Sequence, residues 1–170
     1  MAQVRGFPPI SQPDARILIL GSMPSRESVA RQQYYAHPRN GFWPILTALL
    51  GIEATTYEER AAQVVRRGVA IWDVLQTCLR AGSLDSAIDD RSIVTNDFQA
   101  FFHGHPNIRR IYFNGAKAEA VYRKHVLPTL SGTAASLPLR RLPSTSPAHA
   151  GMTLEQKQAA WRSLLDDVVE

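Results

Sequence analysis

The residues from Tyr34 to Trp43 hold the densest group of side chains that could do chemistry. They are Tyr-Tyr-Ala-His-Pro-Arg-Asn-Gly-Phe-Trp, so aromatic, basic and amide groups lie within one short stretch. An aromatic face such as that of Tyr35 can stack on a nucleobase, and Arg39 could hold a phosphate. The alternative is structural: the aromatics belong to the core and Asn40 caps a helix. For Trp43 we favour the core.

A second polar group is the amide of Asn114, which precedes Gly115 at the end of an apolar run. An amide carries a hydrogen-bond acceptor and a donor side by side, so it can grip the N–H/C=O edge of a base through two hydrogen bonds. An asparagine before a glycine can equally serve only to end a strand.

Two hydroxyl-rich loops complete the set. Residues 21–25 are Gly-Ser-Met-Pro-Ser, and residues 143–149 are Pro-Ser-Thr-Ser-Pro-Ala-His. Their hydroxyl and backbone N–H groups could bind phosphates, and a simple turn is the alternative for each loop. His149 could act as a base or be an ordinary exposed loop residue. The glycine and lysine spacing of a nucleotide-binding loop is absent.

A small α/β hydrolase is one enzyme class that these residues leave open. Ser22 or Ser144 would be its nucleophile, with His37 or His149 as the base. The sequence shows no acidic partner at a supporting spacing and no Gly-x-Ser-x-Gly elbow, so we do not favour this class.

The composition fits one domain with a real core and restricts the chemistry. Of 170 residues 45% are hydrophobic, and 19 Lys and Arg against 15 Asp and Glu give a net charge of +4. This charge permits a nucleic-acid partner without requiring one. The single cysteine, Cys78, excludes an intrachain disulfide, a four-cysteine zinc site and a cysteine-ligated iron–sulfur cluster within this chain. The apolar run at 17–20 is too short to span a membrane, so we expect a cytoplasmic protein without a membrane partner.

Apolar runs that end in these loops indicate the elements that position them. We expect strands at residues 15–20, 69–75, 108–113 and 137–142. Helical spacing of apolar residues predicts helices from 26, at 40–50, 57–67, 97–103 and 115–125, and from 153 onward. A capping box of Thr153 and Gln156 begins the last helix. Residues 1–14, with three prolines, are predicted to form an irregular N-terminal arm, and residues 76–96 a long loop.

This alternation predicts a single domain over residues 1–170 with an α/β fold, a three-layer α/β/α sandwich around a mostly parallel four-stranded sheet. Ligands bind such sheets at the carboxyl ends of the strands. We therefore expect the loops after Leu20, Phe113 and Leu142 to meet in one site.

Four segments, in their order along the chain, resemble the uracil-DNA glycosylase superfamily. They are residues 21–25, 34–43, 114–115 and 143–149. Residues 20–25 stand where that superfamily has a Gly-x-x-Pro loop, residues 36–43 are similar to a His-Pro-x-Asn-x-Phe-Trp stretch of its mismatch-specific branch, and Pro143-Ser144 is similar to its second motif. The resemblance is greatest to the hypoxanthine-DNA (deoxyinosine) glycosylases. Those enzymes have a Gly-Ser-Met-Pro loop, a catalytic asparagine in the place of Asn40 and an Asn-Gly in the place of Asn114-Gly115.

The resemblance implies a monofunctional DNA glycosylase that hydrolyses the N-glycosidic bond of a deaminated base in base excision repair. Hypoxanthine is the base that we expect most. It implies no metal and no cofactor, and the proposed motifs contain no lysine that could form a Schiff base. The expected partner is DNA that contains deaminated bases, and the expected state is a monomer. A uracil- or mismatch-specific enzyme of the same fold, or a non-catalytic nucleic-acid-binding relative, are the alternatives.

Roles for single residues follow from the same resemblance. Asn40 is the expected catalytic residue, Tyr35 the face on which the extruded base stacks, and Asn114 the reader of its edge. The other expected base-binding residues are Gly21, Ser22, Met23 and Ser25. The expected contacts to DNA come from Arg39, Ser144, Thr145, Ser146 and His149.

Departures from the superfamily pattern sharpen these expectations. Met23 stands where related branches have an aspartate or asparagine, and a thioether cannot activate water, so Asn40 is the nearest polar candidate. Ser25 replaces a tyrosine that fills the pocket of the uracil-specific branch, which leaves room for a purine. Leu142 replaces a histidine that faces the leaving base. The loop at 143–149 also lacks the large apolar residue expected of a wedge between bases.

Overall fold

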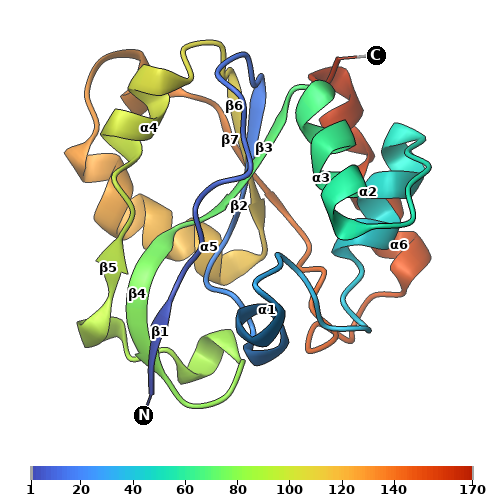
Figure 1. The fold of residues 1–170 in the computed structure, drawn as a ribbon. Coiled ribbons are helices and arrows are strands. Elements are labelled where there is room, and N and C mark those ends of the chain that lie inside the picture. The colour runs from blue at the N-terminus through green and yellow to red at the C-terminus, as the bar shows by residue number, and fades with distance from the viewer. Residues whose placement is uncertain (1, 170) are drawn as a thin grey trace.

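Four parallel strands form the centre of the molecule, in the order β3-β2-β6-β7 (Figure 1). In this computed structural model, which describes residues 2–169, they are β2 (Ile17–Gly21), β3 (Val69–Asp73), β6 (Arg110–Asn114) and β7 (Leu139–Leu142). All residues of β2 and β3 are buried, as expected for strands covered on both faces. The four predicted strands and their parallel pairing are confirmed.

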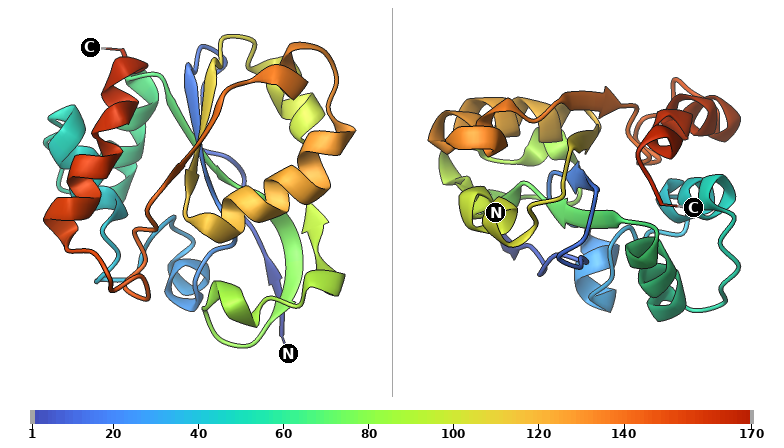
Figure 2. Two further views of the ribbon diagram at one scale, coloured as in Figure 1. Left: turned by 180° about the vertical axis from the view of Figure 1, so that it is seen from behind. Right: turned by 90° about the horizontal axis from the view of Figure 1, so that it is seen from above.

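Helices cover both faces of this sheet, so the molecule has three layers (Figures 1 and 2). One face carries α4 (Phe98–Gly104) and α5 (Ala116–Val121), and α5 continues as a π-helical turn over Tyr122–Val126. The other face carries α2 (Phe42–Leu50), α3 (Tyr57–Arg66) and α6 (Leu154–Trp161). The predicted α/β/α sandwich is confirmed. The short helix α1 (Arg26–Arg31) follows β2.

Capping residues fix where these helices begin and end. Thr153 and Gln156 form the predicted capping box at the start of α6. Gly51 ends α2 with a left-handed φ of 63°, a conformation that glycine adopts without a steric penalty. The apolar stripe of the last helix is only partly buried. Trp161 and Leu164 lie in the core, whereas Leu154 at the helix start is exposed.

A second, antiparallel sheet corrects two of the sequence predictions. It has the order β1-β4-β5 and consists of β1 (Ala2–Arg5), β4 (Leu75–Arg80) and β5 (Val94–Thr95). Residues 1–14 are therefore not wholly irregular, and residues 76–96 are not one loop. The sequence does not predict β1 because this strand pairs with a distant segment. It does not predict β4 because polar Gln76 and Thr77 and the buried Arg80 weaken the apolar pattern of that strand.

Short 3-10 turns connect several of these elements, at Asp85–Ala87, Asp90–Ser92, Leu127–Thr129, Gly132–Ser136 and Arg162–Asp166. No helix in the described part of the chain is long and apolar enough to cross a membrane.

The register of the parallel sheet brings the strand ends together. Gly21 at the end of β2 lies beside Asp73 at the end of β3, and Asn114 at the end of β6 lies beside Leu142 at the end of β7. β2 is the middle strand between β3 and β6. The loops that leave these ends therefore surround one point at the carboxyl edge of the sheet.

Candidate active site

A cavity of about 320 Å³ lies at this carboxyl edge. Such a volume is at the lower end of the range for small-molecule pockets. The structure brings together nearly all of the predicted site residues in its wall, namely Gly21, Ser22, Met23, Ser25, Tyr35, Asn40, Asn114, Ser144, Thr145, Ser146 and His149. Arg39 does not line the cavity, although it precedes Asn40 and is exposed.

The absence of a side chain at Gly21 lets two polar groups approach the end of β2. A Cβ atom at this position would lie 2.6 Å from Oδ1 of Asp73 and 2.8 Å from the hydroxyl oxygen of Tyr35. Both groups line the cavity. Gly21 is therefore required by close packing rather than by an unusual backbone angle.

Asp73 is a carboxyl group without a partner in the floor of the cavity. The residue is 3% exposed, and its Oδ2 has no hydrogen bond within the described residues. Burial first, and then the charge of Asp85, raise the pKa of Asp73 from 3.8 to about 7, against the lowering effect of Arg80. Near neutral pH this carboxyl group is thus divided between its neutral and ionised forms.

Tyr35 is held in a strained backbone conformation at the same place. Its φ is 55°, in the left-handed region that a tyrosine rarely adopts. Its ring stacks on Phe42 with a centroid distance of 3.9 Å, so one face of the ring is covered. Burial and the charge of Asp73 raise the pKa of its hydroxyl group, which stays protonated. A base could therefore stack only on the face opposite to Phe42.

Asn40 lies half-buried immediately before α2. Its Oδ1 accepts a hydrogen bond from the backbone N–H of Phe42 at 2.9 Å, but Gly41, not Asn40, is the N-cap residue of α2. Its Nδ2 makes no hydrogen bond within the described residues. This hydrogen bond fixes the orientation of the amide and leaves two N–H donors and one acceptor lone pair available.

Asn114 is bound to Thr145 through both ends of its amide. Its Nδ2 donates to Oγ1 of Thr145 at 3.0 Å, and its Oδ1 accepts from the backbone N–H of Thr145 at 2.9 Å. One proton and one lone pair of the amide remain for a ligand. The positive φ of 96° at Gly115, which follows, lets the chain turn away from the strand next to Ser144.

The loop at 143–149 is ordered by its own hydroxyl groups. Ser144 accepts from the N–H of Ser146, and Ser146 accepts from the N–H of Ala148, at 3.2 Å each. Lys157 from α6 donates to the carbonyl of Ser146 at 3.2 Å. The O–H group of each serine remains free to donate a hydrogen bond to a phosphate oxygen.

Met23 and Ser25 form the part of the cavity wall that follows β2. Met23 is buried, and Ser25 caps α1 by accepting from the N–H of Ser28 at 3.2 Å. The small side chain of Ser25 is therefore occupied in the cap and does not fill the cavity.

Arg80 joins two walls of the site. It is 2% exposed, and it donates to the carbonyl of Gly82 at 2.8 Å and to the carbonyl of Pro24 at 2.6 Å. Pro24 belongs to the loop after β2, whereas Gly82 belongs to the segment after β4. One guanidinium group thus holds both segments in place.

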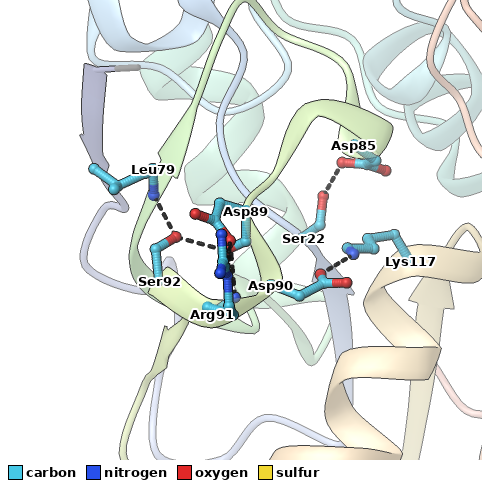
Figure 3. A network of polar contacts seen from close by, with 8 residues as sticks. All are labelled: Ser22, Leu79, Asp85, Asp89, Asp90, Arg91, Ser92 and Lys117. Atoms are coloured by element: carbon cyan, nitrogen blue, oxygen red, sulfur yellow. Dashed lines mark hydrogen bonds and ion pairs between the residues drawn. The ribbon is translucent and has the colours of Figure 1, made fainter.

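The geometry of a serine hydrolase is not formed in the described residues. The hydroxyl of Ser22 donates to the carboxylate of Asp85, not to a histidine (Figure 3). Nδ1 of His37 accepts from the backbone N–H of Arg39 at 3.1 Å, and the ring of His149 bonds to no serine. Residues 2–169 also contain no cluster of three or more His, Cys, Asp or Glu side chains that could hold a metal ion.

Comparison with known families decides the class of protein to which this pocket belongs. The sequence profile described as the Uracil DNA glycosylase superfamily matches residues 8–165, nearly the whole chain. The chain belongs to the uracil DNA glycosylase superfamily. The resemblance of the four segments is therefore confirmed at the level of this superfamily.

Relatives within the uracil DNA glycosylase superfamily cover most of the chain. A protein from Methanosarcina acetivorans named hypoxanthine DNA glycosylase is 38% identical over 138 residues, which are 75% of this chain and 86% of the relative. One of the same name from Methanosarcina barkeri is 36% identical over 116 residues, or 67% of this chain and 72% of the relative.

A solved structure agrees with this assignment. The solution NMR structure of a Methanosarcina acetivorans protein, described as a candidate uracil DNA glycosylase, superposes with a TM-score of 0.77 at 34% identity. The superposition covers 96% of this chain and 99% of that one. The uracil DNA glycosylase fold is thus shared over the full domain.

Asp73, Leu84 and Asp85 are among the residues of this superfamily member's pocket that sequence reasoning missed. Asp73 ends β3, whereas the predicted strand runs on to Leu75, so the rule that ligands bind at carboxyl ends points past Asp73. Leu84 and Asp85 lie in the segment predicted as a long loop, where no local pattern marks them.

Proposed function

We propose that this chain is a monofunctional DNA glycosylase that hydrolyses the N-glycosidic bond of deoxyinosine and releases hypoxanthine in base excision repair. The observation that carries this proposal is the cavity at the carboxyl edge of the sheet, with the Asn40 amide at one wall and the Asn114 amide at another. The names of the two Methanosarcina relatives support the same substrate.

The cavity is suited to a base that has left the duplex. An enzyme that acts on a base must extrude its nucleotide, because the glycosidic bond is not accessible within the stack. Tyr35 lines the cavity with one ring face stacked on Phe42, so stacking of a base is assigned to the opposite face, and Ser25 leaves open the wall that a larger residue would close. A purine can thus enter.

Recognition of the base edge is assigned to Asn114. Thr145 already binds the edge of the amide at which its N–H and C=O lie side by side, so the remaining proton and lone pair point apart, and the amide can bind either O6 or N1–H of hypoxanthine. Adenine presents these groups in the reverse order and would leave buried polar groups unpaired, at a cost of roughly 1–3 kcal/mol each. Uracil presents the same pair as hypoxanthine, so pocket volume must separate the two.

Asn40 is assigned to the bond-breaking step. As the C1′–N9 bond breaks, its electron pair leaves with the base, and water adds to C1′ with loss of a proton. The N–H donors of Asn40 can stabilise the negative charge that develops on the base, and its lone pair can orient the water. The hydrogen bond from Phe42 holds the amide in place for this role.

Asp73 completes the proton balance of this reaction. A neutral carboxyl group in the floor can donate a proton to a ring nitrogen of the departing purine, and the carboxylate that remains can be reprotonated as water loses its proton. Its pKa of about 7 allows both forms near neutral pH. Protonation of a ring nitrogen helps a purine to leave more than it helps a pyrimidine.

The test is a base-release assay on duplexes that contain deoxyinosine, deoxyuridine, deoxyxanthosine or mispaired thymine. We expect free hypoxanthine to be released fastest, with an abasic strand that breaks only on alkali treatment. Asn40→Ala should lower this rate by roughly a hundredfold or more. Asn40→Asp is the matched control for folding, since a carboxylate can still accept the hydrogen bond from Phe42 while it lacks the N–H donors.

Each other outcome of this assay contradicts part of the proposal. Fastest release of uracil or thymine would make the chain a uracil- or mismatch-specific enzyme. Binding to the duplexes without release of any base would make it a non-catalytic relative. Full activity of Asn40→Ala would remove Asn40 from the mechanism.

A further inference from the structure

One exposed apolar side chain lies at the rim of the cavity. The large hydrophobic side chains that are exposed in the described residues are Val29, Leu79, Leu84, Val94, Leu154 and Leu165. Leu84 is the most exposed of them, at 55%, and it alone among them also lines the cavity. An apolar side chain that is both exposed and in contact with a pocket stands at its mouth, and such exposure calls for an explanation.

The backbone on both sides of Leu84 is fixed to the rest of the pocket. Asp85 accepts a hydrogen bond from Ser22 (Figure 3), and Ser83 accepts from the backbone N–H of Arg26 at 2.9 Å. Arg80 holds the carbonyl of Gly82. Leu84 is thus presented from a segment tied to the loop after β2 and to the start of α1.

The far end of the same segment is anchored as well. Lys117 from α5 donates to the carboxylate of Asp90 at 2.6 Å, and Ser92 accepts from the backbone N–H of Leu79 at 2.7 Å (Figure 3). The segment from Gly82 to Ser92 is therefore a braced projection rather than a loose loop. An anchored segment loses little backbone freedom when one of its side chains inserts into a partner.

Among the described residues that line the cavity, Leu84 is the one exposed large aliphatic side chain, since Met23 is buried. The loop at 143–149 contributes serine, threonine, alanine and histidine to the cavity, without a large apolar residue. A protein that unstacks a base commonly fills the gap with an apolar side chain such as leucine. The position and type of Leu84 meet this need.

We propose that Leu84 is the wedge, which inserts into the base stack of duplex DNA and occupies the space that the extruded nucleotide vacates. This inference rests on the proposed function, because it requires that a base be extruded into the cavity. The partner is double-stranded DNA at the lesion, and the contact is apolar rather than ionic.

The experiment compares Leu84→Ala with Leu165→Ala. Leu165 is an exposed leucine near the opposite edge of the sheet, beside Asp167, which binds Arg110 at the start of β6. Base release is measured on a deoxyinosine duplex and on the same strand unpaired. We expect Leu84→Ala to lower kcat/KM on the duplex by about tenfold or more and to change the rate on the unpaired strand by less than about twofold, since only the duplex needs unstacking. Leu165→Ala should match the wild type on both.

Two results would overturn the proposal. One is an unchanged rate of Leu84→Ala on the duplex. The other is an equal loss on duplex and single strand, which would place Leu84 in binding of the base itself. Leu84→Met, which restores an apolar side chain of similar size, should recover most of the duplex activity, and its failure to do so while folded would also contradict a wedge.

A second readout separates the wedge from the chemistry. A 2-aminopurine placed next to the lesion brightens when the stack opens, whether or not the base is released. We expect the wild type to brighten it and Leu84→Ala to do so much less. If no base is released by the wild type, the proposed function fails, and this fluorescence still decides the wedge: equal brightening by both proteins, or none by the wild type, overturns it.

Discussion

Asn114 and Thr145 are joined by two hydrogen bonds that use both ends of the asparagine amide, at 3.0 and 2.9 Å. This pair closes the gap between the end of β6 and the loop that follows β7. It also sets the plane of the amide. The residue assigned to the base edge is therefore oriented before any ligand binds, and a site that is preorganised binds at lower entropic cost.

Loss of the Thr145 hydroxyl should impair the site through Asn114. Thr145→Val keeps the volume but leaves Nδ2 of the buried asparagine without its acceptor, so we expect a loss of roughly 1–3 kcal/mol in the free energy of unfolding and a higher KM. Thr145→Ser keeps the hydroxyl and is the matched control. Chemical denaturation and steady-state base release measure both effects, and an unchanged KM in Thr145→Val would contradict this coupling.

Ser25→Tyr should close the cavity to purines. The larger side chain would occupy the open wall, so release of hypoxanthine should fall more than release of uracil. Tyrosine also removes the cap of α1, which costs about 1 kcal/mol. Ser25→Ala loses the cap without filling the wall, and it should retain purine release. If Ser25→Tyr excises hypoxanthine at the wild-type rate, the pocket does not depend on space at this position.

Asp73 should make stability fall as the pH rises. Its pKa is about 7 in the folded protein and 3.8 as its ordinary value, so folding favours the neutral acid. The contribution of neutral Asp73 to the free energy of unfolding is complete below pH 4. It is lost as the pH rises toward 7, and the free energy of unfolding falls by at most roughly 4 kcal/mol. Asp73→Asn should be more stable than the wild type at pH 8. Denaturation curves of both proteins from pH 5 to 9 test this, and parallel curves would contradict it.

The same substitution tests the proton-donor role. Wild-type release of hypoxanthine should decline as the pH passes about 7, because ionised Asp73 can no longer donate. Asp73→Asn should lose that decline together with most of the purine rate. A pH profile of kcat that is the same in both proteins would show that Asp73 does not take part.

Arg39→Ala should weaken DNA binding and reduce its salt dependence. If Arg39 contacts one phosphate, the slope of log Kobs against log salt should become shallower by about 0.9. Arg66→Ala is the control, because Arg66 is an exposed arginine in the last turn of α3, at the other edge of the sheet. Equal slopes for the three proteins would place Arg39 away from the phosphates.

The central sheet could be predicted from the sequence because its strands carry the apolar pattern themselves. Ile17 to Leu20 is buried on both faces, and such strands are continuous apolar runs. β1 and β4 could not be found in this way. Their pairing joins Ala2 with Arg80, and a contact between distant residues leaves no local periodicity.

The candidate site also has parts that the sequence predicts and parts that it does not. The loops after β2, β6 and β7 were placed together because a parallel sheet gathers its carboxyl ends. Asp73 is not among the predicted site residues because the predicted strand extends to Leu75. Asp73 then lies within the strand and not at its carboxyl end. The pairing of Asn114 with Thr145 and of Ser22 with Asp85 depends on tertiary contacts alone.

The guanidinium group of Arg80 has a consequence for the substrate. Because it binds the carbonyl of Pro24 in the cavity wall and that of Gly82 next to the lining residues Ser83 and Leu84, these two parts of the wall are tied together and have little freedom to move apart. The distortion needed for entry of the base is then borne by the nucleic acid. The neighbourhood of the lesion should therefore govern the turnover rate, with weakly stacked flanking base pairs processed faster than stiff ones.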